Sequence, residues 1–96
     1  MEAEQIGKLF VEIITPEAKI FAGEAESILF PGADGDIFVL PSHLPLVCVL
    51  REGNLLINLS DEEKKEFSLF GGILEVDNDK VKIISSKAEE KETAKV

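Results

Sequence analysis

The chain has 96 residues, 45% of them hydrophobic, which allows one compact domain and leaves no room for a second. A net charge of −9 at pH 7, without a cluster of Lys and Arg, excludes the phosphate-neutralising surface that nucleic-acid binding requires. No apolar run approaches the roughly 20 residues that cross a bilayer as a helix, so we predict no direct membrane insertion.

The first half of the chain alternates short apolar segments with turn residues, which is the spacing of an all-β sandwich or barrel. The first two segments flank the turn Thr15-Pro16-Glu17 and predict a hairpin. Glycines in residues 31–35 and prolines in residues 41–45 predict two loops of defined shape. Strands are therefore predicted over residues 9–14, 18–22, 24–30 and 37–40.

Residues 46–50 are apolar at every position, so both faces of that strand must be covered. One face can enter the interior of the sandwich. The other face needs a neighbouring element or a partner protein, because contiguous apolar surface is uncommon on a monomer. Cys48 lies within this run without a basic neighbour, which favours a buried, inert thiol.

The second half of the chain continues the β pattern. Residues 51–54 predict a hairpin turn, residues 60–64 a charged tip, and Gly71-Gly72 a kink or bulge. Asp77-Asn78-Asp79 predicts the last turn. Further strands are predicted over residues 55–60, 66–69, 73–76 and 81–84.

Composition divides the chain into three parts. Residues 1–7 are predicted as an N-terminal extension, residues 8–86 as the β-sandwich domain, and residues 87–96 as a polar tail. The tail is rich in Lys, Glu and Ala and has no wide apolar face, so we expect a frayed segment in place of a helix.

The residues that carry chemistry in other proteins do not form a site here. One His and one Cys cannot supply the ligands of a transition-metal site, so His43 is predicted as a loop residue. No G-x-S-x-G motif is present, and the glycines fit neither the P-loop nor the dinucleotide fingerprint. A calcium loop starting at Asp77 fails at Lys82 and Ala88. We predict no enzyme activity, no catalytic residue, no cofactor, no metal and no bound nucleotide.

One Cys also excludes an internal disulfide, and the acidic start of the chain is unlike a secretory signal. These features predict an intracellular protein. The acidic excess favours association with a basic protein surface over an anionic lipid surface.

Three segments together resemble a known family. Residues 31–46, PGADGDIFVLPSHLPL, resemble the signature of the ATP synthase epsilon subunit, and residues 70–76, FGGILEV, resemble a second motif of that family. Residues 8–32 are similar to its opening strands. Phe38 and Phe70 depart from this pattern, because the family usually has Gly and Ser there, and both departures predict a difference in local packing or in the partner surface.

The resemblance implies an all-β fold, a roughly ten-stranded β-sandwich. The family commonly continues into a two-helix hairpin, and this sequence departs from the family there, because we expect a short polar tail and no helical hairpin. It also implies a rotor subunit in the central stalk of a proton-translocating synthase. Such a subunit links the gamma subunit to the c ring and supports the coupling of ion flow to ATP synthesis. It lies on the cytoplasmic-type face of an energy-transducing membrane, as in a bacterial cell membrane, and belongs to a peripheral membrane complex.

The resemblance also assigns two sets of site residues. The loop facing the c ring contains Asp34, Gly35 and Asp36. The residues facing gamma are Thr15, His43, Pro45 and Cys48. On this reading Cys48 lines an interface and not the core, whereas loop geometry alone explains Gly35 and Pro45 equally well.

A second function from another class remains open at this point. A free-standing β-sandwich interaction module has the same composition and the same apolar run. Co-purification separates the two hypotheses, because only the rotor subunit requires gamma and the c ring.

Overall fold

The computed structural model describes residues 7–91, and all the regular structure in this range is β-strand. The predicted all-β fold is confirmed. The strands are β1 (Leu9–Ile14), β2 (Lys19–Ala25), β3 (Ser27–Gly32), β4 (Gly35–Val39), β5 (Leu46–Asn58), β6 (Lys64–Asp77), β7 (Lys80–Ile84) and β8 (Ala88–Lys91).

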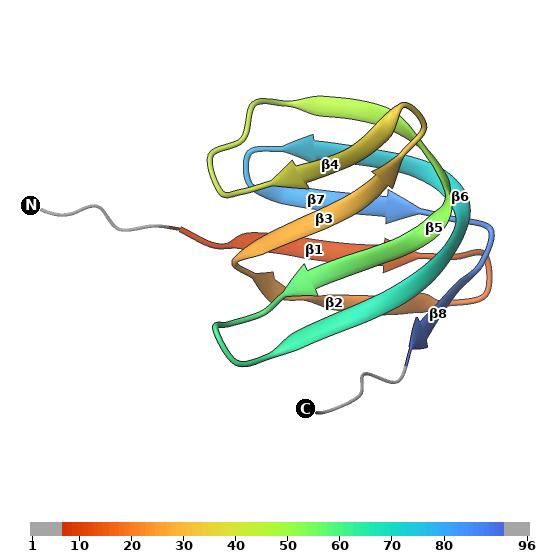
Figure 1. The fold of residues 1–96 in the computed structure, drawn as a ribbon, viewed down its shortest axis with the longest axis horizontal. Helices are drawn as coiled ribbons and strands as arrows, with labels where there is room; N and C mark the ends of the chain where they lie inside the picture. The colour runs from red at the N-terminus through yellow and green to blue at the C-terminus, as the bar shows by residue number, and fades with distance from the viewer. Residues whose placement is uncertain (1–6, 92–96) are drawn as a thin grey trace, which may run out of the picture.

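The strands form two packed layers, as the predicted sandwich requires. The hydrogen-bonded order is β2-β1-β7-β6-β5-β3-β4, and β8 also pairs with β6. The long strands β5 and β6 curve together at one side of the molecule, so their two halves lie in different layers (Figure 1). One layer contains β2, β1, β7 and the halves of β6 and β5 beside them, and the other contains β8, the remaining halves, β3 and β4.

The core lies between the layers because alternate side chains of each strand point inward. On β1, Leu9, Val11 and Ile13 are fully buried, while the residues between them face outward. Phe21 and Phe67 meet edge to face with ring centroids 5.8 Å apart, a favourable geometry for an aromatic pair. Apart from Phe30 and Phe67, the buried hydrophobic residues of the described chain are all aliphatic.

The corner where β6 changes layer is built from glycine and serine. Gly71 and Gly72 have φ angles of 83° and 139°. Opposite them the chain leaves β7 at Ser85 and resumes pairing with β6 at Ala88. The buried Ser85 Oγ donates to the Gly71 carbonyl oxygen at 2.6 Å and accepts from the Lys87 N–H at 3.3 Å. This hydroxyl satisfies backbone groups that the change of layer removes from the ladder.

Within residues 7–91 the structure has eight strands where about ten were expected, and part of the difference has a specific cause. The hairpin turn predicted at residues 51–54 is wrong, because β5 runs through this segment for 13 residues. Its register with β6 is unbroken, with Leu50 opposite Gly72 and Glu52 opposite Phe70. The polar residues at the bend are exposed, and in sequence an exposed bend resembles a turn. The turns predicted at residues 15–17, 60–64 and 77–79 are confirmed.

The polar tail expected from residue 87 differs from the observed structure, since Ala88–Lys91 forms strand β8. Ala88 packs on the core, and Lys65 Nζ donates to Glu90 Oε2 at 2.8 Å. That hydrogen bond and the charge of Glu90 raise the pKa of Lys65. Ala88 is the only buried residue of β8, so the strand has no hydrophobic pattern in sequence. The remaining parts of the expected extension and tail, residues 1–6 and 92–96, lie outside the described residues.

Candidate functional site

An exposed row of aliphatic side chains crosses the outer face of the layer that contains β1 and β7. Val49 lies opposite Ile73, Ile73 opposite Ile84, and Ile84 beside Ile14 on the parallel strand β1. Val49, Ile73 and Ile84 are 60%, 50% and 51% exposed. These four residues are called the apolar row below. Neighbouring exposed apolar side chains on one face mark an interaction surface more often than isolated ones do.

The next row on the same face is mostly charged. Val47 is followed across the strands by Glu75, Lys82 and Glu12, which alternate in sign. Lys19 also pairs with Glu12, with Nζ 2.9 Å from Oε2. Opposite charges on adjacent strands stabilise each other modestly at the surface. The face therefore combines an apolar row with a charged row, as in the polar rim of a protein interface.

The acidic turn between β3 and β4 lies beside the apolar row. Gly32 and Gly35 pair across this turn, and Asp36 lies opposite Pro31. Gly35 has φ 139°, a conformation that favours glycine. The backbone N–H of Ala33 donates to the carbonyl oxygen of Val49 at 2.9 Å, which ties the turn to β5 and to the apolar row.

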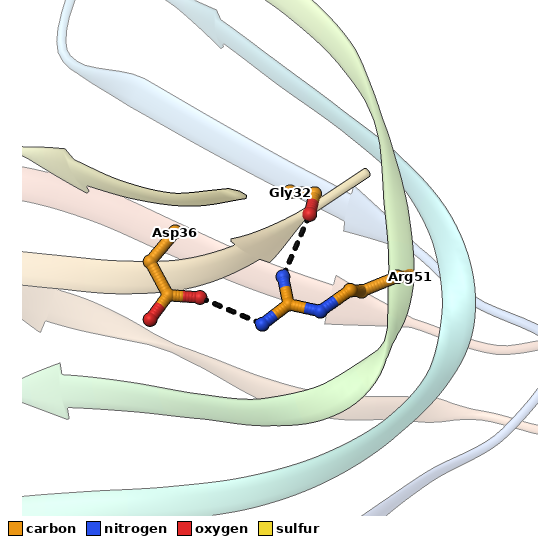
Figure 2. A network of polar contacts seen from close by, with 3 residues as sticks. All are labelled: Gly32, Asp36 and Arg51. Atoms are coloured by element: carbon orange, nitrogen blue, oxygen red, sulfur yellow. Dashed lines mark hydrogen bonds and ion pairs between the residues drawn. The ribbon is translucent and has the colours of Figure 1, made fainter. Parts of the chain in front are cut away.

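Arg51, at the bend of β5, reaches this turn with both ends of its guanidinium group (Figure 2). Nη1 donates to the Gly32 carbonyl oxygen at 2.7 Å, and Nη2 donates to Asp36 Oδ1 at 2.9 Å. The charge of Asp36 is therefore already compensated within the chain. Asp34 makes no ion pair with any of residues 7–91.

A shallow hollow of about 380 Å³ separates the acidic turn from β5. Ile37, Cys48 and Val49 supply its apolar wall, and the turn from Ala33 to Asp36 supplies its polar wall. The hollow is open to solvent and has no cluster of convergent titratable groups. Its open form and its apolar wall suit a contact surface.

The residues assigned to a gamma-facing surface by resemblance do not form one cluster. Thr15 directly follows β1, and its hydroxyl donates to the Ala18 carbonyl oxygen at 3.1 Å. His43 and Pro45 lie in the connection before β5, at the opposite end of this layer, where the Ser42 N–H donates to Asp79 Oδ1 at 2.6 Å. His43 Nδ1 donates to the Leu44 carbonyl oxygen at 2.7 Å. The apolar row and the charged row lie between these two ends.

Cys48 has the packing role that was one of the two considered from the sequence. Its side chain packs against the core, while its neighbours Val47 and Val49 point outward from β5. Partial burial raises the pKa of the Cys48 thiol, which disfavours the reactive thiolate. It also lines the hollow beside the acidic turn. Its packing role in the core is therefore observed directly.

Within residues 7–91, no three His, Cys, Asp or Glu side chains gather closely enough to hold a metal ion. The same segment contains no helix of the length and apolarity that a membrane crossing demands.

Two features of this surface were missed from the sequence. Arg51 was assigned to a hairpin turn, so its contact with Asp36, 15 residues earlier, was not expected. Ile73 and Ile84 were read as ordinary strand residues, because their apolar alternation does not tell which face is covered. The uninterrupted apolar run at residues 46–50 was the signal of the apolar row, and it correctly indicated an uncovered face.

Comparison with known proteins adds the family context. The family described as "ATP synthase, Delta/Epsilon chain, beta-sandwich domain" matches residues 8–91. The ATP synthase epsilon chain of Brevibacillus brevis is 34% identical over 84 residues, which cover 88% of this chain and 64% of that protein. The epsilon chain of Bordetella avium is 38% identical over 80 residues, which cover 83% of this chain and 57% of that protein. That of Chlorobium limicola is 33% identical over 75 residues, covering 78% and 85%.

Solved structures agree on the fold. A chain in the Euglena gracilis mitochondrial ATP synthase, in a structure of its OSCP/F1/c-ring, superposes with a TM-score of 0.81 at 17% identity, covering 94% of this chain and 62% of that chain. A chain from the central stalk/c-ring of the Tetrahymena thermophila mitochondrial ATP synthase superposes with a TM-score of 0.71 at 16% identity. The match covers 88% of this chain and 68% of that chain. This chain thus spans 64% and 57% of the length of the Brevibacillus and Bordetella relatives.

Proposed function

Because this chain belongs to the family of the ATP synthase delta/epsilon chain β-sandwich domain, we propose that it is a non-catalytic subunit of a rotary ATP synthase. In this role it links the gamma subunit to the c ring in the central stalk and supports the coupling of proton flow to ATP synthesis. The complex lies on the cytoplasmic-type face of an energy-transducing membrane. The match over residues 8–91 is the observation that carries the proposal.

The apolar row is the part of this surface that best fits the gamma subunit. Its exposed aliphatic groups gain free energy when a partner covers them, at roughly 25 cal/mol per Å² of apolar surface removed from water. Thr15 lies at one end of this face, and His43 and Pro45 lie at the other. A single partner that spans the face would contact His43 and Pro45 at one end and cover the buried Thr15 at the other.

The acidic turn is the part that best fits the c ring. Asp34, Gly35 and Asp36 lie at the tip of a hairpin and are exposed. A charged tip suits a partner with basic loops, because complementary charge speeds association and fixes orientation. The turn adjoins the apolar row at Val49, so gamma and the c ring would meet neighbouring parts of the sandwich.

Affinity purification tests this proposal. A tagged full chain, expressed in its host and extracted with detergent from membranes, should bring down gamma and the c subunit. Recovery of the folded chain with neither subunit would overturn the proposal and support a free-standing interaction module.

A matched pair of variants tests the face. In this purification the Ile73→Asp variant should no longer bring down gamma, because the substitution places a charge in the centre of the apolar row. Phe38→Asp is the control, because Phe38 is 52% exposed, against 50% for Ile73, and lies on β4 in the other layer. Equal loss of gamma from both variants would contradict the assignment of the apolar row.

A further inference from the structure

We propose that Arg51 is a positioning residue that locks the acidic turn and neutralises Asp36, so that Asp34 is the acid this turn offers to a basic partner. The inference rests on the proposed function only for the identity of that partner, the c ring. The role of Arg51 within the chain stands on the contacts of the turn itself.

The geometry of the guanidinium group supports this role. One nitrogen donates to a backbone carbonyl on β3 and the other to a carboxylate on β4, so one side chain bridges both arms of the hairpin (Figure 2). The planar guanidinium holds these two donors at a fixed spacing, which the single ammonium group of Lys does not. Arg51 therefore restrains the hairpin in a way that charge alone does not.

A second restraint acts on the other side of the turn. The bond from Ala33 N–H to the Val49 carbonyl oxygen ties the turn to β5 two residues before Arg51. The interior of the hairpin is also tight, because a Cβ placed on Gly32 would lie 2.6 Å from the Gly35 carbonyl oxygen. The tip is thus pinned to β5 at Val49 and at Arg51, and only Ala33 and Asp34 lie between its paired glycines.

The distribution of charge follows from these contacts. Asp36 Oδ1 forms an ion pair with Arg51 Nη2 at 2.9 Å, so a basic partner that binds Asp36 must compete with Arg51. Asp34 has no ion pair within residues 7–91 and borders the hollow lined by Ile37, Cys48 and Val49. A Lys or Arg side chain from the partner would place its aliphatic stem along that wall and its charge at Asp34.

Nuclear magnetic resonance on the isolated full chain tests the restraint without any partner. In Arg51→Gln the order parameter of the Gly35 amide should fall from about 0.85, typical of rigid backbone, to below about 0.6. In Arg51→Lys this order parameter should lie between those two values, because Lys keeps the charge but lacks the two fixed donors of the guanidinium group. Lys19→Gln is the matched control, since it removes an exposed ion pair of the same 2.9 Å length far from the turn. An unchanged order parameter at Gly35 in Arg51→Gln would overturn the positioning role.

Binding to the purified c ring tests the consequence. Arg51→Gln makes the turn more acidic, so an electrostatic role alone predicts tighter binding, whereas a positioning role predicts binding weaker by about threefold or more. Asp34→Asn should weaken binding by about tenfold, and Asp36→Asn by less than that. Tighter binding by Arg51→Gln, or a larger loss for Asp36→Asn than for Asp34→Asn, would overturn the inference. A wild-type chain that does not bind the c ring would instead reject the proposed function, and the Gly35 measurement would still decide the role of Arg51.

Discussion

Two regions meet on β6: the corner at Gly71 and Gly72, and the apolar row, to which the next residue, Ile73, belongs. At the corner, the backbone of one strand approaches another so closely that a side chain has no room. In the apolar row, the side chain of Ile73 points away from the core and is half exposed. Adjacent residues of one strand therefore have different roles, because the corner determines the fold and the apolar row offers a surface to a partner. The following substitutions separate the two roles through the free energy of unfolding.

The largest expected effect lies at the corner. Gly72→Ala should lower the free energy of unfolding by about 3 kcal/mol or more, because a Cβ there overlaps the carbonyl oxygen of Ile84. Gly35→Ala is a matched control with the same φ of 139° and no atom within 4 Å of the added Cβ. Gly35→Ala should lower the free energy of unfolding by only about 1–2 kcal/mol, the cost for alanine of adopting this backbone conformation. Urea unfolding measures both, and equal losses would show that close packing at the corner does not matter.

Ser85→Ala should have the next largest effect. It leaves the Gly71 carbonyl oxygen without its bond from the buried Ser85 hydroxyl, at a cost of about 1–3 kcal/mol. Ser86→Ala is the control, because its exposed hydroxyl is 3.4 Å from the Phe70 carbonyl oxygen, and it should change stability by about 0.5 kcal/mol or less. If the two variants unfold at the same urea concentration, the serine does not support the corner.

A smaller, pH-dependent effect is expected at Cys48, on the inward side of the apolar run. Burial raises its pKa in the folded state, so the unfolded thiol loses its proton first as the pH rises. The stabilisation is fully present below the unfolded pKa and is lost as the pH passes through the folded pKa. Between pH 7 and pH 10 the wild-type chain should therefore lose slightly more stability than Cys48→Val, measured by urea unfolding at each pH. A steeper loss in Cys48→Val would contradict the inward placement.

The smallest effect is expected in the apolar row. Ile73→Thr should change the free energy of unfolding by less than about 1 kcal/mol, because both side chains are β-branched and the position is half exposed. A loss as large as that of Ser85→Ala would mean that Ile73 supports the fold and is not reserved for a partner. Thermal unfolding of the two variants side by side provides this comparison.

The sequence predicts the strands that alternate regularly and fails where a strand bends. Residues 9–14 and 81–84 alternate between buried and exposed side chains, so their strands were correctly predicted. At residues 51–54 a bend with exposed polar residues has the composition of a turn, and only the pairing of Glu52 with Phe70 shows that the strand continues. Pairing between distant residues leaves no local pattern.

The candidate surface was predictable to a similar extent. The apolar run at residues 46–50 indicated an uncovered face. The interior of a two-layer sandwich covers only one face of a strand, so the apolar side chains on the other face remain outside. The bridge from Arg51 to Asp36 was not predictable, because an exposed charged residue forms an ion pair with whichever residue the fold brings near. The order of the family motifs located the acidic turn, but sequence gave no means of deciding which of its two aspartates is already paired.

The parallel pairing of β1 with β7 has a consequence for biosynthesis. Phe10 lies opposite Lys80 and Ile14 opposite Ile84, so the second partner of β1 leaves the ribosome long after β1 itself. At roughly 5–20 residues per second, the intervening 70 or so residues take roughly 4–14 s to translate. During that time the hairpin of β1 and β2 has an unpaired apolar edge, the kind of surface that chaperones bind and that aggregates in their absence. We expect the nascent chain to need protection from the emergence of β1 until β7 has been made.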